Sequence, residues 1–297
     1  MTTPIMHETK THGKLSFPYT VYRGIIPEYI RSYPLHWHDE MEIIYVIGGS
    51  GIVTAQTNRH ILKAGDMMIL LPQVVHSIEQ LDNMPMEYFN ILFQFSLLGS
   101  GISDGCYEKY FKPLYDHTRT ITPYLPAHSP LNRLLLPYIC NLIENRRQKE
   151  DTYALMIKSN LFAIMHHLNQ HCEQVSEAWL SLHSTYEKLK KLLSYVQKNY
   201  DKPITIAQAA DICGFSPSHF MKLFKELTGR TFVQYLKDFR LEIAAGQLAD
   251  GTLKIIEAAE NAGFNNHSYF TRSFIEKYGI SPSEYQKEHQ KGRVSCS

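Results

Sequence analysis

The stretch "ITIAQAADICGFSPSHFMKLFKELTG", residues 204–229, has the pattern of two amphipathic helices joined by a tight turn. Thr205 is a suitable N-cap for the first helix, whose apolar residues recur at i, i+3, i+4 and i+7. Gly214 ends that helix because glycine accepts a positive φ. Ser216 followed by Pro217 is a start signal for the second helix. The stretch therefore predicts a helix-turn-helix.

The same pattern recurs in "LKIIEAAENAGFNNHSYFTRSFIEKYG", residues 253–279. Phe220 and Phe270 stand in corresponding positions 50 residues apart, whereas the Gly-Phe turns are 49 residues apart, so the second turn is one residue longer. Between the copies, residues 232–250 contain one glycine and no proline, which predicts a connecting helix of roughly 28 Å. A helix of that length would hold two recognition helices about one DNA turn apart, roughly 34 Å.

The second helix of each copy has a polar outer face if its phenylalanines point into the core. The residues predicted to face outward and contact DNA are Ser218, Met221, Lys222 and Lys225 in the first copy, and Ser268, Thr271 and Arg272 in the second, with His267 in the longer turn.

Base contacts can be assigned to these side chains by their chemistry. Lys222 would bridge guanine acceptors, Met221 would contact a thymine methyl group, and Ser218 would bond a base or a phosphate. Arg272 is the strongest candidate for reading guanine. The alternative is that Lys222 and Lys225 contact only phosphates.

Residues 184–290 resemble the DNA-binding domain of the AraC/XylS family of bacterial transcription regulators. The motifs are "GFSPSHFMKLFKELTG", "FRLEIAAGQL" and "GFNNHSYFTRSFIEKYGISPSEY", in that order. The resemblance implies that both recognition helices enter adjacent major grooves of a double-stranded DNA operator, and that the protein is a transcription regulator with RNA polymerase as a partner. An activator is expected, and a repressor is the alternative. Charge agrees with a polyanionic ligand here, because residues 184–297 have 16 Lys and Arg against 12 Asp and Glu, whereas residues 1–183 have 14 against 17.

The N-terminal half has a different pattern. Between residues 40 and 95, short β-rich runs are separated by Gly, Pro and Asn, which predicts a β-barrel or a double sheet. This segment resembles a cupin domain. The positions that match the two cupin motifs are His36, His38 and Glu42 in the first, and Gly65, Asp66, Pro72 and His76 in the second. The predicted fold class is therefore two-domain α+β, with an N-terminal cupin-like β-barrel and a C-terminal all-α double helix-turn-helix.

The stretch "HWHDEME", residues 36–42, places two histidines and two carboxylates on alternate positions. On a strand these residues would share a face, and His36, His38 and Glu42 would converge, with His76 as a fourth neighbour. Three nitrogens and one carboxylate suit zinc, iron, nickel or manganese. This set makes a metal-dependent cupin enzyme or a metal-sensing regulator the alternative interpretation.

The preferred interpretation is an effector pocket without catalytic residues, metal or cofactor, in which the histidines bond neighbouring groups. Flat rings beside histidine, carboxylate and amide groups suit the faces and hydroxyls of a sugar, so a carbohydrate or glycoside is the expected effector, and aromatic acids or other metabolites remain open. The predicted effector-binding residues are His36, Trp37, His38, Glu42, Tyr45, His76 and Asn90.

Helical patterns return after the barrel, over residues 130–173. The family resemblance implies that this helix pair forms a homodimer interface; the alternative is that both helices cover their own barrel. The predicted domains are residues 1–175 for effector binding and dimerisation, 176–185 as a linker and 186–297 for DNA binding. By family resemblance, a polar N-terminal arm, residues 1–16, would close over the pocket.

The amino-acid composition limits the classes of protein to which this chain can belong. The chain of 297 residues is 44% hydrophobic and 20% charged, as in globular proteins. It has no run near the roughly 18 apolar residues of a membrane helix, and no signal core at its start, so a cytoplasmic location without membrane contact is expected. The five cysteines include no CxxC pair, which predicts neither a disulfide framework nor a thiolate zinc site.

Overall fold

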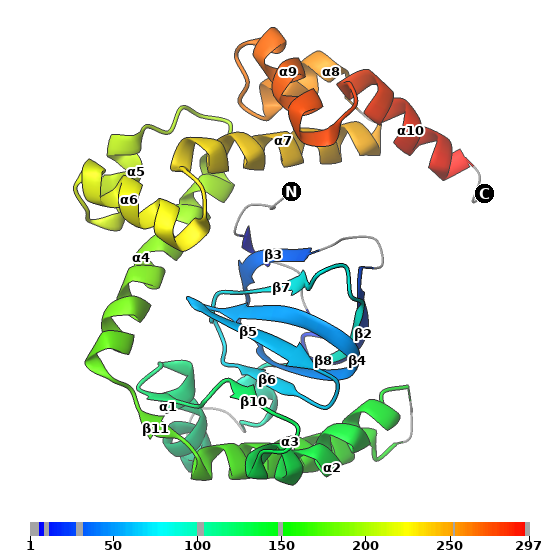
Figure 1. Cartoon of the computed structure of the whole chain (residues 1–297), viewed down its shortest axis with the longest axis vertical. Helices are drawn as coiled ribbons and strands as arrows, with labels where there is room; N and C mark the ends of the chain where they lie inside the picture. The colour runs from blue at the N-terminus through cyan, green and yellow to red at the C-terminus, as the bar shows by residue number, and fades with distance from the viewer. Residues whose placement is uncertain are drawn as a thin grey trace. The chain divides into compact units, whose positions relative to one another are not determined.

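The computed structural model describes residues 6–8, 12–27, 32–99, 104–147, 151–251 and 253–294 (Figure 1). The chain divides into two compact units, Met6–His183 and Ser184–Ser297. The first unit is rich in β-strands and the second is helical, so the predicted two-domain α+β fold is confirmed. None of the described helices is long and apolar enough to cross a membrane.

The first unit is built on one large sheet whose strands curl around an interior. Nine described strands belong to it: β1 (Met6–His7), β2 (Tyr19–Ile26), β3 (Ser32–Trp37), β4 (Met41–Ala55), β5 (Asn58–Lys63), β6 (Met67–Leu70), β7 (His76–Gln80), β8 (Met86–Phe93) and β10 (Tyr124–Leu125). A second, two-stranded sheet pairs β9 (Arg119–Thr120) with β11 (Glu173–Gln174). Three short helical segments, η1 (Phe95–Leu97), η2 (Tyr107–Phe111) and α1 (Lys112–Tyr115), lie between β8 and β9.

Strand β4 is shared by the two sides of the sheet. Its first half, from Met41, lies between β8 and β6, and its second half, to Ala55, lies between β5 and β7. The strand bends at Gly49, where φ is +68° and a Cβ atom would lie 1.8 Å from the carbonyl oxygen of Pro85. Glycine is required at this bend because any other side chain would collide with the β8 side of the sheet.

Alternation along β4 and β8 produces two separate apolar cores. On one face, Ile44, Val46 and Tyr88 point into the sheet interior. On the other face, Ile43 and Ile91 pack against helices α2 (Pro130–Glu144) and α3 (Tyr153–Gln170). Figure 1 shows these two helices side by side along one face of the sheet.

The helical stripes predicted for residues 130–173 are confirmed. The buried residues are Leu135, Ile139, Leu142 and Ile143 in α2, and Leu161, Ile164, Met165 and Leu168 in α3. Helix α2 begins at a Ser129 N-cap, whose side-chain oxygen accepts a hydrogen bond from the backbone N–H of Asn132.

Helix α4 (Glu177–Asn199) begins inside the segment predicted as a linker, residues 176–185. The boundary between the two units, at His183 and Ser184, lies within this helix. On the first-unit side, the rings of Trp179 and His183 stack with centroids 4.8 Å apart, and His117 packs against both.

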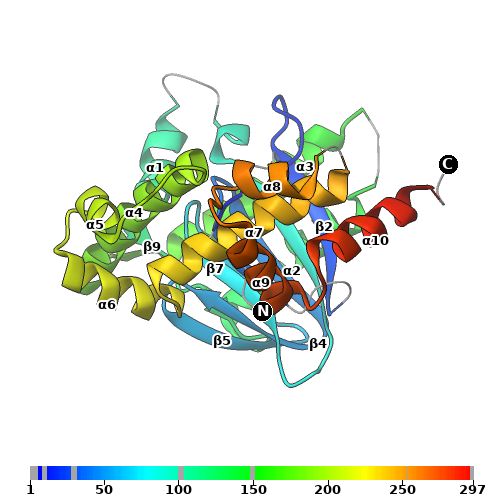
Figure 2. The same cartoon turned by 90° about the horizontal axis from the view of Figure 1, so that it is seen from above.

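The second unit has two helix-turn-helix units at the two ends of one long helix, as Figures 1 and 2 show. Its helices are α5 (Ile206–Cys213), α6 (Pro217–Thr228), α7 (Phe232–Asp250), α8 (Ile255–Asn261), α9 (His267–Tyr278) and α10 (Pro282–Val294), following α4. The connecting helix covers the predicted residues 232–250. Thr205 and Gln208 form a capping box at the start of α5, and Gly214 ends α5 with a φ of 66°, as the sequence predicts.

Candidate effector cavity and DNA-binding helices

The first unit contains a cavity of about 210 Å³ among β2, β3, β4 and β8. Tyrosine rings, charged groups and an amide line it together, with apolar contributions from Ile78 and Leu92. The complete lining is Glu8, His12, Tyr22, Arg23, Gly24, Tyr33, His36, His38, Glu42, Ile78, Tyr88, Asn90 and Leu92. This mixture of flat rings and polar groups suits a small polar ligand.

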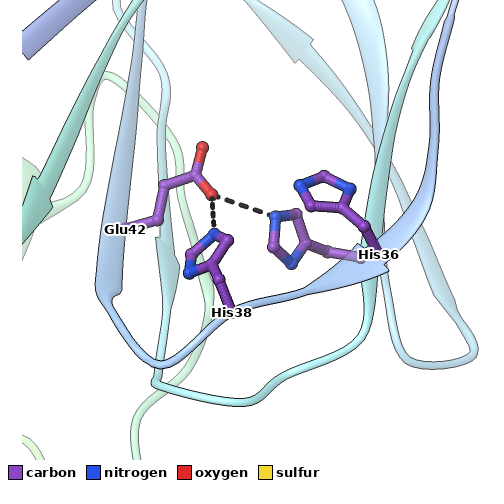
Figure 3. Close-up of side chains that lie close together, drawn as sticks. His36, His38 and Glu42 are labelled. Atoms are coloured by element: carbon purple, nitrogen blue, oxygen red, sulfur yellow. Dashed lines mark hydrogen bonds and ion pairs between the residues drawn. The ribbon is translucent and has the colours of Figure 1, made fainter. Parts of the chain in front are cut away.

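Four side chains predicted to converge do lie together. His36, His38, Glu42 and His76 each offer one ligand atom, and these atoms all lie within 4.8 Å of one another. The Nε2 atom of His38 is hydrogen-bonded to Glu42 Oε2 at 3.0 Å, as Figure 3 shows, and the ring of His36 lies farther from this carboxylate. His76 Nε2 lies 2.9 Å from the same oxygen, within ion-pair distance but without hydrogen-bond geometry.

The route by which these residues meet differs from the prediction. Residues 36–42 do not form one strand, because β3 ends at Trp37 and β4 begins at Met41. His36 lies opposite His76 in the pairing of β3 with β7, and Glu42 enters from β4. The buried pairing surfaces of three strands, and not the period of a single strand, bring the four side chains together.

The second ring nitrogen of two histidines is held by the backbone. His38 Nδ1 lies 3.2 Å from the carbonyl oxygen of Glu40, and His76 Nδ1 lies 2.8 Å from that of Val74. A carbonyl oxygen can only accept, so each Nδ1 is the protonated donor. The other ring nitrogen, Nε2, faces the carboxylate of Glu42 in both His38 and His76.

The neighbouring histidines stabilise the buried, charged carboxylate of Glu42. Burial raises the pKa of Glu42, but the nearby charge of His76 and the hydrogen bond and charge of His38 lower it more, so its pKa lies well below the ordinary value. Burial lowers the pKa of His38, and the hydrogen bond and charge of Glu42 outweigh it, so that pKa is raised. Glu42 is 2% exposed, so this is a buried ion pair and not a surface contact.

Three residues predicted to bind effector do not line the cavity: His76, which lies behind Glu42, and Tyr45 and Trp37. Tyr45 lies on the opposite face of β4 and packs against the core beneath α2 and α3, because it is an odd number of residues from Glu42. Trp37 is buried, and its ring stacks on that of His7 with centroids 5.3 Å apart. The prediction that Tyr45 and Trp37 line the pocket is therefore wrong.

Asn90 does line the cavity, as predicted. Its side-chain oxygen is buried and has no hydrogen-bond partner among the residues that the structure describes. A buried amide oxygen without a partner loses free energy, and a ligand donor would restore it.

Sequence reasoning missed Glu8 and His12 as individual lining residues. They reach the cavity because β1 pairs in parallel with β3, with Met6 opposite His36. The interaction of Glu8 with His12, which lies 3.4 Å away, lowers the pKa of Glu8 more than burial raises it. No local pattern marks these residues, because the contact joins segments about 30 residues apart.

The first recognition helix, α6, presents the predicted outer face. Phe220 and Phe224 are buried, and the four outward residues Ser218, Met221, Lys222 and Lys225 are exposed. Lys222 Nζ lies 3.9 Å from Glu226 Oε1, a contact in which both side chains are largely exposed. Such a pair is weak, so Lys222 is available to other anions.

The second recognition helix, α9, differs in two details. Ser268 and Arg272 are exposed, but Thr271 is half-buried. His267 is the first residue of α9 and does not lie in the preceding turn, because Asn266 caps the helix through a hydrogen bond from the backbone N–H of Tyr269.

Known protein families match both units of the chain. Residues 23–164 match the family described as an AraC-like ligand binding domain, and residues 209–288 match the one described as a helix-turn-helix domain. The chain belongs to the AraC/XylS family of transcription regulators. This AraC-type protein is thus a sequence-specific DNA-binding transcriptional regulator with a ligand-binding domain in its first unit.

Relatives extend over nearly the whole AraC-type chain. It is 22% identical over 285 residues to an uncharacterized HTH-type transcriptional regulator, YdeC of Bacillus subtilis (strain 168), covering 95% of this chain and 96% of the relative. It is 26% identical over 252 residues to the HTH-type transcriptional activator RhaS of Mannheimia succiniciproducens, covering 85% and 88%. A crystal structure of ToxT from Vibrio cholerae covers 91% of this chain and 97% of that one, with 14% identity and a TM-score of 0.45.

The buried cluster leads to a stability prediction for Glu42→Gln. Removing one charge from a buried pair leaves the other uncompensated, so we expect a loss of about 3–5 kcal/mol in the free energy of unfolding. Urea unfolding followed by tryptophan fluorescence measures this in the first unit, because both tryptophans, Trp37 and Trp179, lie there.

The matched control is Glu87→Gln, because Glu87 pairs with Arg23 near the surface. This change should cost about 0–1 kcal/mol. Equal losses for the two variants would show that the buried carboxylate is not stabilised by its histidines.

Proposed function

We propose that this AraC-type protein is a homodimeric transcription activator controlled by a carbohydrate or glycoside that binds in the cavity of the first unit. The observation that supports this most is the unpartnered Asn90 side-chain oxygen beside tyrosine rings and a buried carboxylate. An amide and a carboxylate suit hydroxyl groups, and tyrosine rings suit the apolar faces of a sugar. Tyr22, Tyr33 and Tyr88 provide those rings.

The activator role has support from a relative's name, since RhaS of Mannheimia succiniciproducens is described as a transcriptional activator and covers 85% of this chain. An activator requires RNA polymerase as a partner at the promoter. Because its target is chromosomal DNA, the protein acts in the cytoplasm.

Base recognition is assigned to the outward faces of α6 and α9. Met221 and Lys222 of α6 contact bases, Lys225 contacts phosphate, and Arg272 of α9 binds guanine through two hydrogen bonds. Support comes from the exposure of these four side chains over buried phenylalanine cores. Ser218, His267, Ser268 and Thr271 complete the proposed DNA contacts.

Effector binding can control operator binding because the two binding equilibria are thermodynamically linked. Effector binding that favours one arrangement of the two DNA-binding domains of a dimer shifts operator affinity by a coupling free energy of typically about 1–3 kcal/mol. The N-terminal segment is a candidate element for this coupling, because Glu8 and His12 line the cavity.

The role of Arg272 is tested with an operator selected from random DNA by the purified protein. Arg272→Ala should lose about 1–3 kcal/mol of binding free energy, roughly 5- to 150-fold in affinity, and relax preference at one base position. Binding is measured by fluorescence anisotropy on the operator and on single-base variants.

Lys225→Ala is the control for Arg272→Ala. It should weaken binding evenly across DNA sequences and reduce the salt dependence by about one counterion. If Arg272→Ala also weakens all sequences evenly, Arg272 contacts phosphate and does not read a base.

The effector proposal is tested by a calorimetric screen of mono- and disaccharides and glycosides. Asn90→Leu should weaken binding of the active sugar about 5- to 150-fold, because a buried hydrogen bond is worth about 1–3 kcal/mol when its partner remains. Operator affinity without sugar should not change.

Tyr45→Phe is the control in this screen, since Tyr45 lies on the other face of β4. It should leave sugar affinity unchanged. Binding of no sugar in the panel, or equal affinity of the Asn90→Leu variant, would refute a carbohydrate effector in this cavity.

Dimer formation is assigned to the helix pair α2 and α3. Leu134, Leu155 and Phe162 are exposed apolar residues of these helices, and Leu155 is 71% exposed. We expect the double variant Leu155→Glu, Phe162→Glu to sediment as a monomer and the natural protein as a dimer, because charge opposes burial of this surface. Ile61→Glu, an exposed apolar residue of β5, is the control and should remain dimeric.

A further inference from the structure

We propose that Arg240 and Gly263 are positioning residues that fix the separation of the recognition helices α6 and α9, and so restrict the protein to DNA with one spacing between its two subsites. This role rests on the proposed reading of DNA by both helices and adds what sets their distance. Helix α7 joins the two helix-turn-helix units along the chain, with one unit at each end (Figure 1). The contacts of Arg240 and Gly263 form a second connection between them.

Arg240 lies near the middle of α7 and holds the loop that leads into the first helix-turn-helix. Its Nε atom donates a hydrogen bond to the carbonyl oxygen of Tyr200 at 2.7 Å, and its Nη2 atom donates one to that of Lys202 at 2.8 Å. Both carbonyl groups belong to the loop between α4, which ends at Asn199, and α5, which begins at Ile206. Because the guanidinium offers both donors in one rigid fork, it fixes the position and direction of this loop.

A ring contact and a charge also attach this loop to α7. The ring of Tyr200 packs on that of Phe239 with centroids 5.7 Å apart. Burial lowers the pKa of Arg240, and the nearby charge of Asp201 opposes this effect. Arginine stays charged in proteins, so its two hydrogen bonds to the loop are charge-assisted and strong. The loop is therefore held against the middle of α7 and not only at its own ends.

Gly263, in the turn of the second helix-turn-helix, lies directly against the same loop. A Cβ atom at Gly263 would lie 2.8 Å from the carbonyl oxygen of Tyr200 and 2.9 Å from that of Asp201, closer than Cβ atoms approach oxygen in proteins. Glycine is thus required for this approach as well as for its φ of +84°. The turn of the second unit packs backbone to backbone against the loop that precedes the first.

The duplicated sequence separates these two requirements for glycine. Gly214 occupies the corresponding turn of the first helix-turn-helix and has a φ of +66°, but a Cβ atom there would meet no atom within 4 Å. The motif itself therefore requires a positive φ and no close neighbour. The contact at Gly263 belongs to the way in which the second unit packs against the first.

Two recognition helices at a fixed distance can both reach bases only if the separation of the DNA subsites matches. Adjacent major grooves on one face of the duplex are about 10–10.5 base pairs apart, so one added base pair moves the second subsite by about 3.4 Å and rotates it by about 35°. The hydrogen bonds of Arg240 and the contact of Gly263 oppose a compensating shift of the second helix-turn-helix. A free hinge between the units would tolerate the added base pair.

The test uses the full chain and the operator selected from random DNA, with one base pair inserted between the two blocks of selected bases. Fluorescence anisotropy gives the ratio of the affinities for the original and the lengthened operator. In the natural protein this ratio should be roughly 5- to 150-fold, the effect of losing one base contact. Arg240→Met and Gly263→Ala should each reduce the ratio about 5-fold or more, because the first frees the loop and the second pushes it away.

Matched controls exist for both variants. Gly214→Ala places the same side chain at a positive φ without a collision, and Lys237→Met removes a positive charge of α7 whose partner, Glu276, is largely exposed. Both controls should retain the ratio of the natural protein. Arg240→Lys keeps the charge but cannot bond two carbonyl groups in one fork, so it should lose selectivity for spacing as Arg240→Met does. Circular dichroism checks folding, and Arg240→Lys replaces Arg240→Met if the latter does not fold.

An unchanged ratio in folded Arg240→Met and Gly263→Ala would overturn the positioning role, as would an equal fall in the two controls. A ratio retained by Arg240→Lys would assign the effect to charge near the DNA and not to the paired hydrogen bonds.

Scrambling each block of selected bases in turn separates this role from the proposed reading of DNA. If one scrambled block leaves the affinity of the natural protein unchanged, the two helices do not both read DNA, and the proposed function fails with the positioning role. If each scrambled block weakens binding and the variants keep the natural ratio, DNA reading by both helices stands and only the positioning role fails.

Discussion

The alternation of side chains along β4 is the constraint on which the first unit depends. One strand borders both the interior and the helix-covered face, so each residue of β4 is assigned to one of two cores by its position. Glu42 and Ile44 point inward, whereas Ile43 and Tyr45 point toward α2 and α3. A register slip of one residue would place the carboxylate of Glu42 in the helix-packed core, away from His38 and His76.

The inward direction of Glu42 places a charged side chain inside the ligand-binding domain, where it needs compensation. A buried carboxylate has a large desolvation cost, and it is tolerated where opposite charge and hydrogen bonds compensate it. His38 and His76 supply that compensation to Glu42, and the carbonyl groups of Glu40 and Val74 fix their orientation. The two rings are therefore held in fixed orientations, and a small ligand in the cavity meets groups that are already oriented.

The DNA-binding unit depends on local sequence to a greater degree. Helices α5, α6, α7 and α9 start at residues whose side chains cap them and end at glycines with positive φ, as at Thr205 and Gly214. Phenylalanines such as Phe220 and Phe270 fill the core of each helix-turn-helix. Because the buried face is fixed by these rings, the outer face of each recognition helix can vary in sequence without loss of fold, and this separates specificity from stability.

The sequence by itself determined the two domains, the duplicated helix-turn-helix, the limits of α7 and the outward residues of α6, because caps, glycines and the helical period act within a few residues. It also named the four members of the cluster. Only the tertiary structure decided how they meet, since the pairing of β7 with both β3 and β4 joins segments far apart in the chain. For the same reason the sequence could not place Tyr45 outside the cavity or Glu8 within it: a strand has two faces, and which one is the interior is settled by the strands and helices that pack against it.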